Sequence, residues 1–190
     1  PGSCLLRLAP LGLDWAPMHL TTTRDGNILT LDSYHGALAK HDSNTGALLW
    51  LTKIASDKST ELQLGRPAEA PDGRIYLPCA ILHNGMIFSE DGKQLETIGE
   101  FGTGPGKMVF PVGVAIGPEE SILVLDRMRH KVLMFDKDHN LLGDFGSMGA
   151  GMGQFYHPWA IAASDNGKVY VAQGYDSRVQ VFNIRDTKAE

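Results

Sequence analysis

The segment Ser121-Ile-Leu-Val-Leu-Asp126 is a short apolar run, and similar segments occur at three other places in the chain. These begin at residues 27, 74 and 168, so consecutive segments start 47 residues apart. A second set of short runs keeps the same spacing and ends at His41, Phe88, Phe135 and Phe182. A period of this length, carried by short β-type segments, is typical of β-propellers and related repeat arrays.

Each unit of the repeat contains signals for four strands, named a to d from the centre outward. Strand a follows a proline in three units (17, 111 and 158) and begins near Leu64 in the other, whereas strands b and c are the two runs above. Asp-Gly or Asn-Gly pairs at 25–26, 72–73 and 166–167 predict type I′ turns between strands a and b. The third unit has Glu119-Glu120 instead, so we expect a looser turn there.

Four antiparallel strands joined by hairpins make one propeller blade. The sequence therefore predicts an all-β protein, a β-propeller of four-stranded antiparallel blades at about 9–52, 60–99, 108–146 and 155–185. Residues 1–8 have the phase of a strand d and are expected to supply a closing outer strand. Two architectures stay open, a closed four-blade ring and part of a larger ring. An open arc would expose two blade faces and favour self-association that completes a ring.

The composition narrows the classes of function. The chain has 190 residues, of which 43% are hydrophobic and 21% charged, and its net charge is -5. Nucleic-acid binding usually leaves a basic footprint, which this composition lacks. The longest apolar stretches, such as Met108 to Ile116, are too short to span a membrane. The opening Pro1-Gly2-Ser3 is typical of a cleaved expression tag, so we draw no expectation about the compartment.

Units three and four share a further motif. Gly104-Pro-Gly106-Lys107 and Gly151-Met-Gly153-Gln154 match in phase, and each leads to the proline before strand a. Together with residues 123–135 and 169–182, this pattern strongly resembles NHL repeats. The consensus of an NHL repeat is G-x-G-x-F-x-x-P, followed by a strand that ends in Asp and then by N-H-R-V-x-x-F. The resemblance covers about residues 95–185. It implies a propeller that in such families usually has six blades, two more than this chain accounts for.

In a propeller of this topology the d-to-a and b-to-c loops emerge at the same end, here called the loop face. Aromatic, Arg and Met side chains on a rigid, loop-bearing face suit protein or peptide recognition. For the aspartates in this set the alternative is hydrogen bonding to the loop amides that follow. The candidate binding residues are Tyr34, Arg127, Arg129, Tyr175, Trp159, Asp32 and Asp126.

No complete catalytic set is visible, so the sequence predicts a non-catalytic scaffold that binds a protein, peptide or glycan ligand and uses no cofactor or metal. One alternative is a metal-dependent lyase or hydrolase resembling peptidyl-amidoglycolate lyase, an NHL-type enzyme with Pro-His pairs on its inner strands. This chain has Pro17-Met18 with His19 displaced by one residue, although Arg127 and Tyr175 stand where that family keeps a catalytic arginine and tyrosine.

Three other site hypotheses rest on weaker signals. Single-stranded RNA binding would use the basic residues at 127, 129 and 131, but the acidity of the chain disfavours it. A metal site could involve His83 and His130, which share a phase. The run from Thr45 to Trp50 resembles the turn of quinoprotein repeats, but in one copy only, and an outer-strand Trp also packs between blades.

Overall fold

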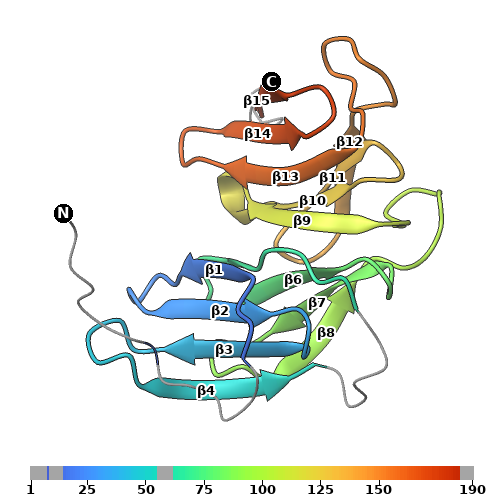
Figure 1. Ribbon diagram of the computed structural model, residues 1–190. Coiled ribbons are helices and arrows are strands. Elements are labelled where there is room, and N and C mark those ends of the chain that lie inside the picture. Colours follow the sequence, from blue (N-terminus) through green and yellow to red (C-terminus); the bar gives the residue numbers. More distant parts are fainter. Residues whose placement is uncertain (1–7, 9–14, 55–61, 185–190) are drawn as a thin grey trace.

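The computed structural model of the protein describes Leu8, residues 15–54 and residues 62–184 (Figure 1). These residues form 15 strands in four antiparallel sheets, in which each strand pairs with the next one along the chain. The all-β propeller architecture predicted from the repeat is therefore confirmed. No helix of the described part of the chain is long and apolar enough to cross a membrane.

The sheets follow one another along the chain. The first contains β1 (His19–Thr22), β2 (Ile28–Asp32), β3 (Ala37–His41) and β4 (Leu48–Lys53). The second contains β5 (Ala68–Glu69), β6 (Ile75–Cys79), β7 (Asn84–Phe88) and β8 (Gln94–Ile98). The third contains β9 (Pro111–Ile116), β10 (Ile122–Asp126), β11 (Lys131–Phe135) and β12 (Leu141–Phe145). The fourth contains β13 (Pro158–Ala163), β14 (Lys168–Gln173) and β15 (Arg178–Asn183).

Hydrophobic cores lie between successive sheets. Leu31 and Ile75 belong to the core between the first and second sheets, and the next two interfaces are filled in the same way. No such core joins the fourth sheet to the first within the described residues, and Figure 1 shows these two sheets at opposite ends of an arc. The closing strand expected at 1–8 lies outside the described residues, apart from Leu8. Val179 and Val181 of β15 are exposed, and self-association through a free blade face stays a prediction.

The inner strand of the second sheet is shorter than its counterparts. It is reduced to the two residues of β5 and an isolated bridge between Leu64 and Cys79. Pro67 directly precedes β5, and Pro78 of β6 lies opposite Gly65, whose N–H donates to the carbonyl of Pro78 at 2.9 Å. Because proline has no N–H to donate to the ladder, regular pairing is interrupted at this point.

The turns between strands a and b differ from the predicted type I′. In the first sheet the N–H of Gly26 donates to the carbonyl of Thr23 at 2.9 Å, and only Gly26 has a positive φ (82°). This is a type I turn followed by a left-handed glycine, the other common hairpin connection. Gly73 and Gly167 repeat it. The prediction of type I′ turns was wrong. An Asp-Gly or Asn-Gly pair is compatible with a type I′ turn and also with a type I turn followed by a left-handed glycine, so the sequence alone does not distinguish them.

The turn of the third sheet was predicted to be looser, and this too is wrong. The N–H of Ser121 donates to the carbonyl of Pro118 at 3.0 Å, which closes a tight turn with Glu119 and Glu120 at its centre. Both glutamates have positive φ, 51° and 61°, as a type I′ turn requires. Neither is a residue type that adopts this conformation readily.

Replacing Glu120 with glycine should therefore stabilise the protein by about 1 kcal/mol, because glycine adopts positive φ without the steric cost of a Cβ atom. Urea unfolding followed by circular dichroism measures the change. Glu120→Ala is the matched control, since it removes the carboxylate and keeps the strained Cβ atom. A gain of the same size in both variants would show that charge, not backbone conformation, sets the stability of this turn.

Candidate functional site

Asp126 shows which loops share one end of the propeller. Its fully buried carboxylate accepts hydrogen bonds from the N–H groups of Val109 (2.6 Å) and Phe110 (3.1 Å), which lie in the loop between β8 and β9. The same carboxylate accepts from Met128 (3.1 Å) and Arg129 (3.0 Å) in the loop between β10 and β11. The d-to-a and b-to-c loops therefore meet at the predicted loop face.

Asp32 has the equivalent role in the first sheet. It is buried and accepts from the N–H groups of Ala16 (2.9 Å), Tyr34 (3.0 Å) and His35 (2.9 Å). Burial alone would raise the pKa of Asp32, but hydrogen bonds from the N–H of Ala16 and from the side chain and N–H of His35 outweigh it and lower the pKa. For both Asp32 and Asp126 the contacts favour the alternative in which aspartate organises the loops.

Arg129 is also engaged with the loops. Its guanidinium donates to the carbonyl oxygens of Lys107 and Thr103, the latter at 2.9 Å, and so holds the loop between β8 and β9. Arg178 of the fourth sheet does the same for the next loop through Ala150 (2.5 Å) and Gln154 (3.1 Å). Arg129 therefore lies on the loop face, as expected, with its donors directed at the protein itself.

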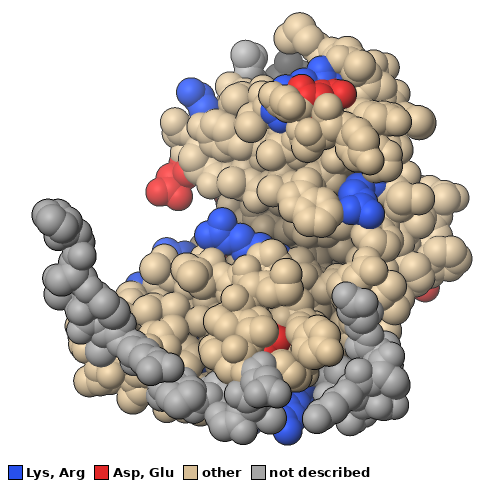
Figure 2. Space-filling view, viewed as in Figure 1, with Lys and Arg blue, Asp and Glu red and all other residues tan. Residues whose placement is uncertain are grey.

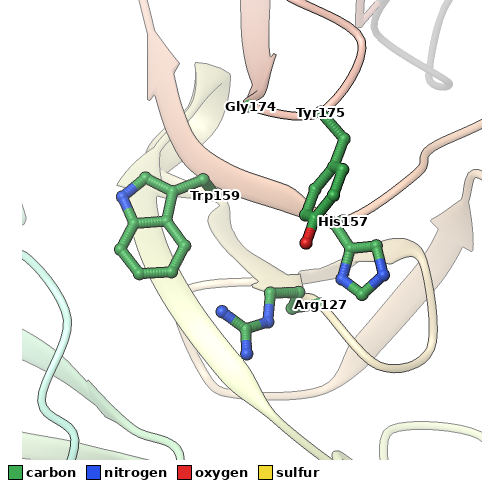
Figure 3. Close-up of a pocket in the computed structure, with 5 residues that line it drawn as sticks. All are labelled: Arg127, His157, Trp159, Gly174 and Tyr175. Atoms are coloured by element: carbon green, nitrogen blue, oxygen red, sulfur yellow. The ribbon is translucent and has the colours of Figure 1, made fainter.

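Three predicted residues come together in one cavity. Arg127, Trp159 and Tyr175 line it with His157 and Gly174, and its volume is about 610 Å³ (Figure 3). Trp159 extends from β13 and is 64% exposed. Tyr175 lies in the short loop after β14 and is 78% exposed. Figure 3 shows the phenol oxygen of Tyr175 directed into the space between Arg127 and His157.

The guanidinium of Arg127 lies between two aromatic rings. Its Cζ atom is 4.7 Å from the ring centroid of Phe110 and 5.4 Å from that of Trp159, within the range of cation–π contacts. Its Nε atom is buried, and no hydrogen-bond partner for it occurs among the described residues. Arg127 is thus oriented by its neighbours and still has donors available.

Aromatic side chains pack against one another beside the cavity. The ring centroids of His157 and Tyr175 are 5.0 Å apart, and Tyr156 lies edge-on to Tyr175 at 5.9 Å. His157 has φ of 47°, a left-handed conformation that is uncommon outside glycine and that occurs often at functional sites. Burial, and then the neighbouring His157, lower the pKa of His130.

Tyr34 lies apart from this group. It is 73% exposed and packs edge-on against His35 in the first sheet, so the structure does not bring it to the cavity of Arg127. Sequence reasoning did not select Phe110 or His157 as site residues. A signal existed, because both directly precede the proline that starts an inner strand and are 47 residues apart.

A second cavity, here called the central cavity, lies along the axis of the arc. It has a volume of about 580 Å³, is lined by inner segments of all four sheets, and shares Arg127 and Trp159 with the first cavity. Figure 2 shows a hollow between the two ends of the arc, bordered by basic side chains.

The other site hypotheses receive less support. The described residues contain no group of three His, Cys, Asp or Glu side chains that could hold a metal ion. His83 instead places its Nδ1 atom 2.6 Å from the carbonyl of Val109. Trp50 donates from Nε1 to the carbonyl of Glu90 at 3.0 Å, and so packs the first sheet against the second.

Comparison with solved structures places the fold among known propellers. Virginiamycin B lyase from Staphylococcus aureus superposes with a TM-score of 0.60 at 13% identity, over 96% of this chain and 60% of the lyase. Proteins of unknown function from Bacteroides thetaiotaomicron (TM-score 0.67, 12% identity) and Bacteroides caccae (0.57, 21%) are matched over 87% and 95% of this chain. The chain spans 46% of the former and 65% of the latter, so it covers less than two thirds of each of these three structures.

Family comparisons agree with this fold. No curated protein matches the sequence. A family model described as a 6-bladed beta-propeller matches residues 67–144, which indicates a propeller larger than the four sheets seen here. An NHL repeat model matches residues 155–182, within the part of the sequence whose motifs resemble NHL repeats. Together with the four successive β-sheets around one axis, these matches support an NHL-repeat β-propeller family for this chain.

Proposed function

We propose that this propeller is a non-catalytic binding module that holds a protein, peptide or glycan ligand on its loop face. The observation that carries the proposal is the cavity formed by Arg127, Trp159 and Tyr175. Trp, Tyr and Arg are the residue types that contribute most binding energy at protein interfaces. Here they stand on a frame whose loops are held by buried carboxylates and guanidinium groups, so little ordering is needed when a ligand binds.

The contacts of the basic residues disfavour the RNA-binding alternative. Such a site needs a continuous basic groove with stacking aromatics. Lys131 is paired with Asp144 at 2.5 Å, and Arg129 donates to loop carbonyls. Only Arg127 of the three predicted basic residues extends toward the aromatic cavity.

The lyase alternative has one observation in its favour. His157 and Tyr175 lie side by side in the cavity that Arg127 lines, and these are residue types that can exchange protons with a substrate. The metal-dependent form of this alternative lacks a ligand set among the described residues. The likeness to virginiamycin B lyase concerns the fold, because the identity is 13%.

The proposal is tested by selecting ligands from a random peptide library and by screening a glycan array for binding. Ligands recovered with the wild-type chain should lose about tenfold or more in affinity for Trp159→Ala and for Tyr175→Ala, because truncating an aromatic anchor commonly costs about 2 kcal/mol. Isothermal titration calorimetry measures the loss. Both side chains are exposed, so the melting temperature should barely change.

Leu142→Ala is the matched control. Leu142 is an exposed apolar residue of the outer strand β12 and does not line either cavity. An equal loss of affinity in this variant would place the ligand elsewhere on the propeller. An empty selection from both libraries would contradict the proposal.

A further inference from the structure

The inner segments of the four sheets place basic residues at one level of the central cavity. His19, Arg66, Gly113 and Ala160 are each 47 residues apart, and all four line this cavity. Arg66 and Gly113 form a parallel bridge, so neighbouring inner segments meet at this level. The third and fourth sheets contribute almost no side-chain volume here, which leaves space in front of the basic groups of the first and second.

A second guanidinium enters the cavity from the loop face. Ser33, Ala80, Arg127 and Gly174 are also in phase, and Arg127 has the only long side chain among them. Within the described residues neither Arg66 nor Arg127 forms an ion pair. No Asp or Glu is among the described residues that line the cavity. Among the residues that the structure describes, the cavity therefore has two guanidinium groups and no counter-charge.

This arrangement opposes the charge of the whole chain. The net charge is -5, yet the lining of the central cavity is positive and otherwise largely apolar, with Val112, Ile161 and Trp159 among its walls. Apolar walls of low dielectric concentrate the field of charges that face a cleft. That field is felt by His19, whose pKa is lowered by burial and by the charge of Arg66.

From these observations we infer that the central cavity binds the carboxylate of a ligand whose body is apolar or aromatic. A guanidinium presents a planar fork of donors that matches a carboxylate, and Arg127 is already held between Phe110 and Trp159. The apolar body would contact Trp159 and the walls formed by Val112 and Ile161. This inference rests on the proposed function, because it names the chemistry of the ligand at the same face.

Two probes of equal shape separate charge from apolar contact. 1-Naphthylacetate carries a carboxylate, and 1-naphthylacetamide replaces it with a neutral amide. Titration calorimetry with the full chain should show the carboxylate binding about tenfold more tightly than the amide, and Arg66→Gln or Arg127→Gln should each remove about that factor. The amide should be insensitive to both substitutions, and added sodium chloride should weaken the carboxylate alone.

Control variants keep the experiment interpretable. Arg24→Gln removes an exposed arginine in the turn between β1 and β2 and should leave both affinities unchanged. Arg66→Lys and Arg127→Lys retain the positive charge, so they should keep part of the preference for the carboxylate even if a glutamine variant folds poorly.

Equal affinities for the two probes, or no measurable binding of 1-naphthylacetate, would overturn the inference. If both probes bound equally and Trp159→Ala weakened both, the loop face would still be a binding site and only the chemistry of its ligand would be wrong. If neither probe bound, the peptide and glycan selections would decide the proposed function separately.

Discussion

Replacing Asp126 with alanine should destabilise the protein by about 4 kcal/mol. The carboxylate accepts hydrogen bonds from four backbone N–H groups in two different loops, and it is fully buried. Each donor left without a partner costs about 1–3 kcal/mol, although relaxation of the loops and entry of water reduce the sum. Urea unfolding measures the loss, which should be accompanied by disorder of the loop that contains Phe110.

Two further substitutions define the origin of this effect. Asp126→Asn keeps one acceptor oxygen and should lose an intermediate amount. Asp91→Ala removes an exposed turn carboxylate paired with Lys93 and should cost far less stability than Asp126→Ala. If Asp126→Ala proved no more damaging than Asp91→Ala, the buried carboxylate would not organise the loop face.

Replacing Gly65 with alanine should cost about 2–3 kcal/mol. A Cβ atom on Gly65 would lie 2.2 Å from the backbone oxygen of Val112 and 2.8 Å from Cγ of Pro78. Backbone cannot rotate away as a side chain can, so the inner segment of the second sheet must move from that of the third. Overpacking of this kind costs about 1–3 kcal/mol and sometimes more. Thermal unfolding measures the loss, and widening of the central cavity would accompany it.

Gly104→Ala is the matched control for this substitution. Its φ is not positive, and an added Cβ atom would meet only the flexible end of Lys107, no closer than 3.8 Å. It should change the free energy of unfolding by less than about 0.5 kcal/mol. A comparable loss at both positions would show that glycine flexibility, and not the close approach of two inner segments, limits stability at Gly65.

Much of the fold could be predicted because the repeat constrains it. The four segments predicted as strand b form β2, β6, β10 and β14 in the structure. The four segments predicted as strand c form β3, β7, β11 and β15. Alternating side chains and hairpin turns report such local pairings directly. The turn types were not predictable, because the conformation of Glu119 and Glu120 depends on how β9 and β10 meet. The repeat does not determine whether the ring closes, and the described sheets form an arc.

The candidate site was predictable only in part. The topology brings Arg127, Trp159 and Tyr175 to one end, so residue type and phase were enough to select them. Residue type could not tell that Arg127 lines the cavity whereas Arg129 holds a loop. The path of the loop between β8 and β9 determines which of the two guanidinium groups donates to carbonyl oxygens. Arg66 is not among the predicted site residues, although a charged residue at a position that Gly113 and Ala160 occupy in other units is itself a signal.

The indole N–H resonances of the three tryptophans provide a direct test of ligand binding at the loop face. Trp159 lines both cavities, whereas Trp50 donates its indole N–H to Glu90 between the first two sheets, far along the chain from the proposed site. A ligand recovered by selection would be titrated into nitrogen-15-labelled protein, with Trp159→Phe used to assign the resonance. Binding at the loop face should shift the Trp159 signal in a saturable way while that of Trp50 stays in place. A ligand that moved Trp50 and left Trp159 unchanged would contradict binding at the loop face.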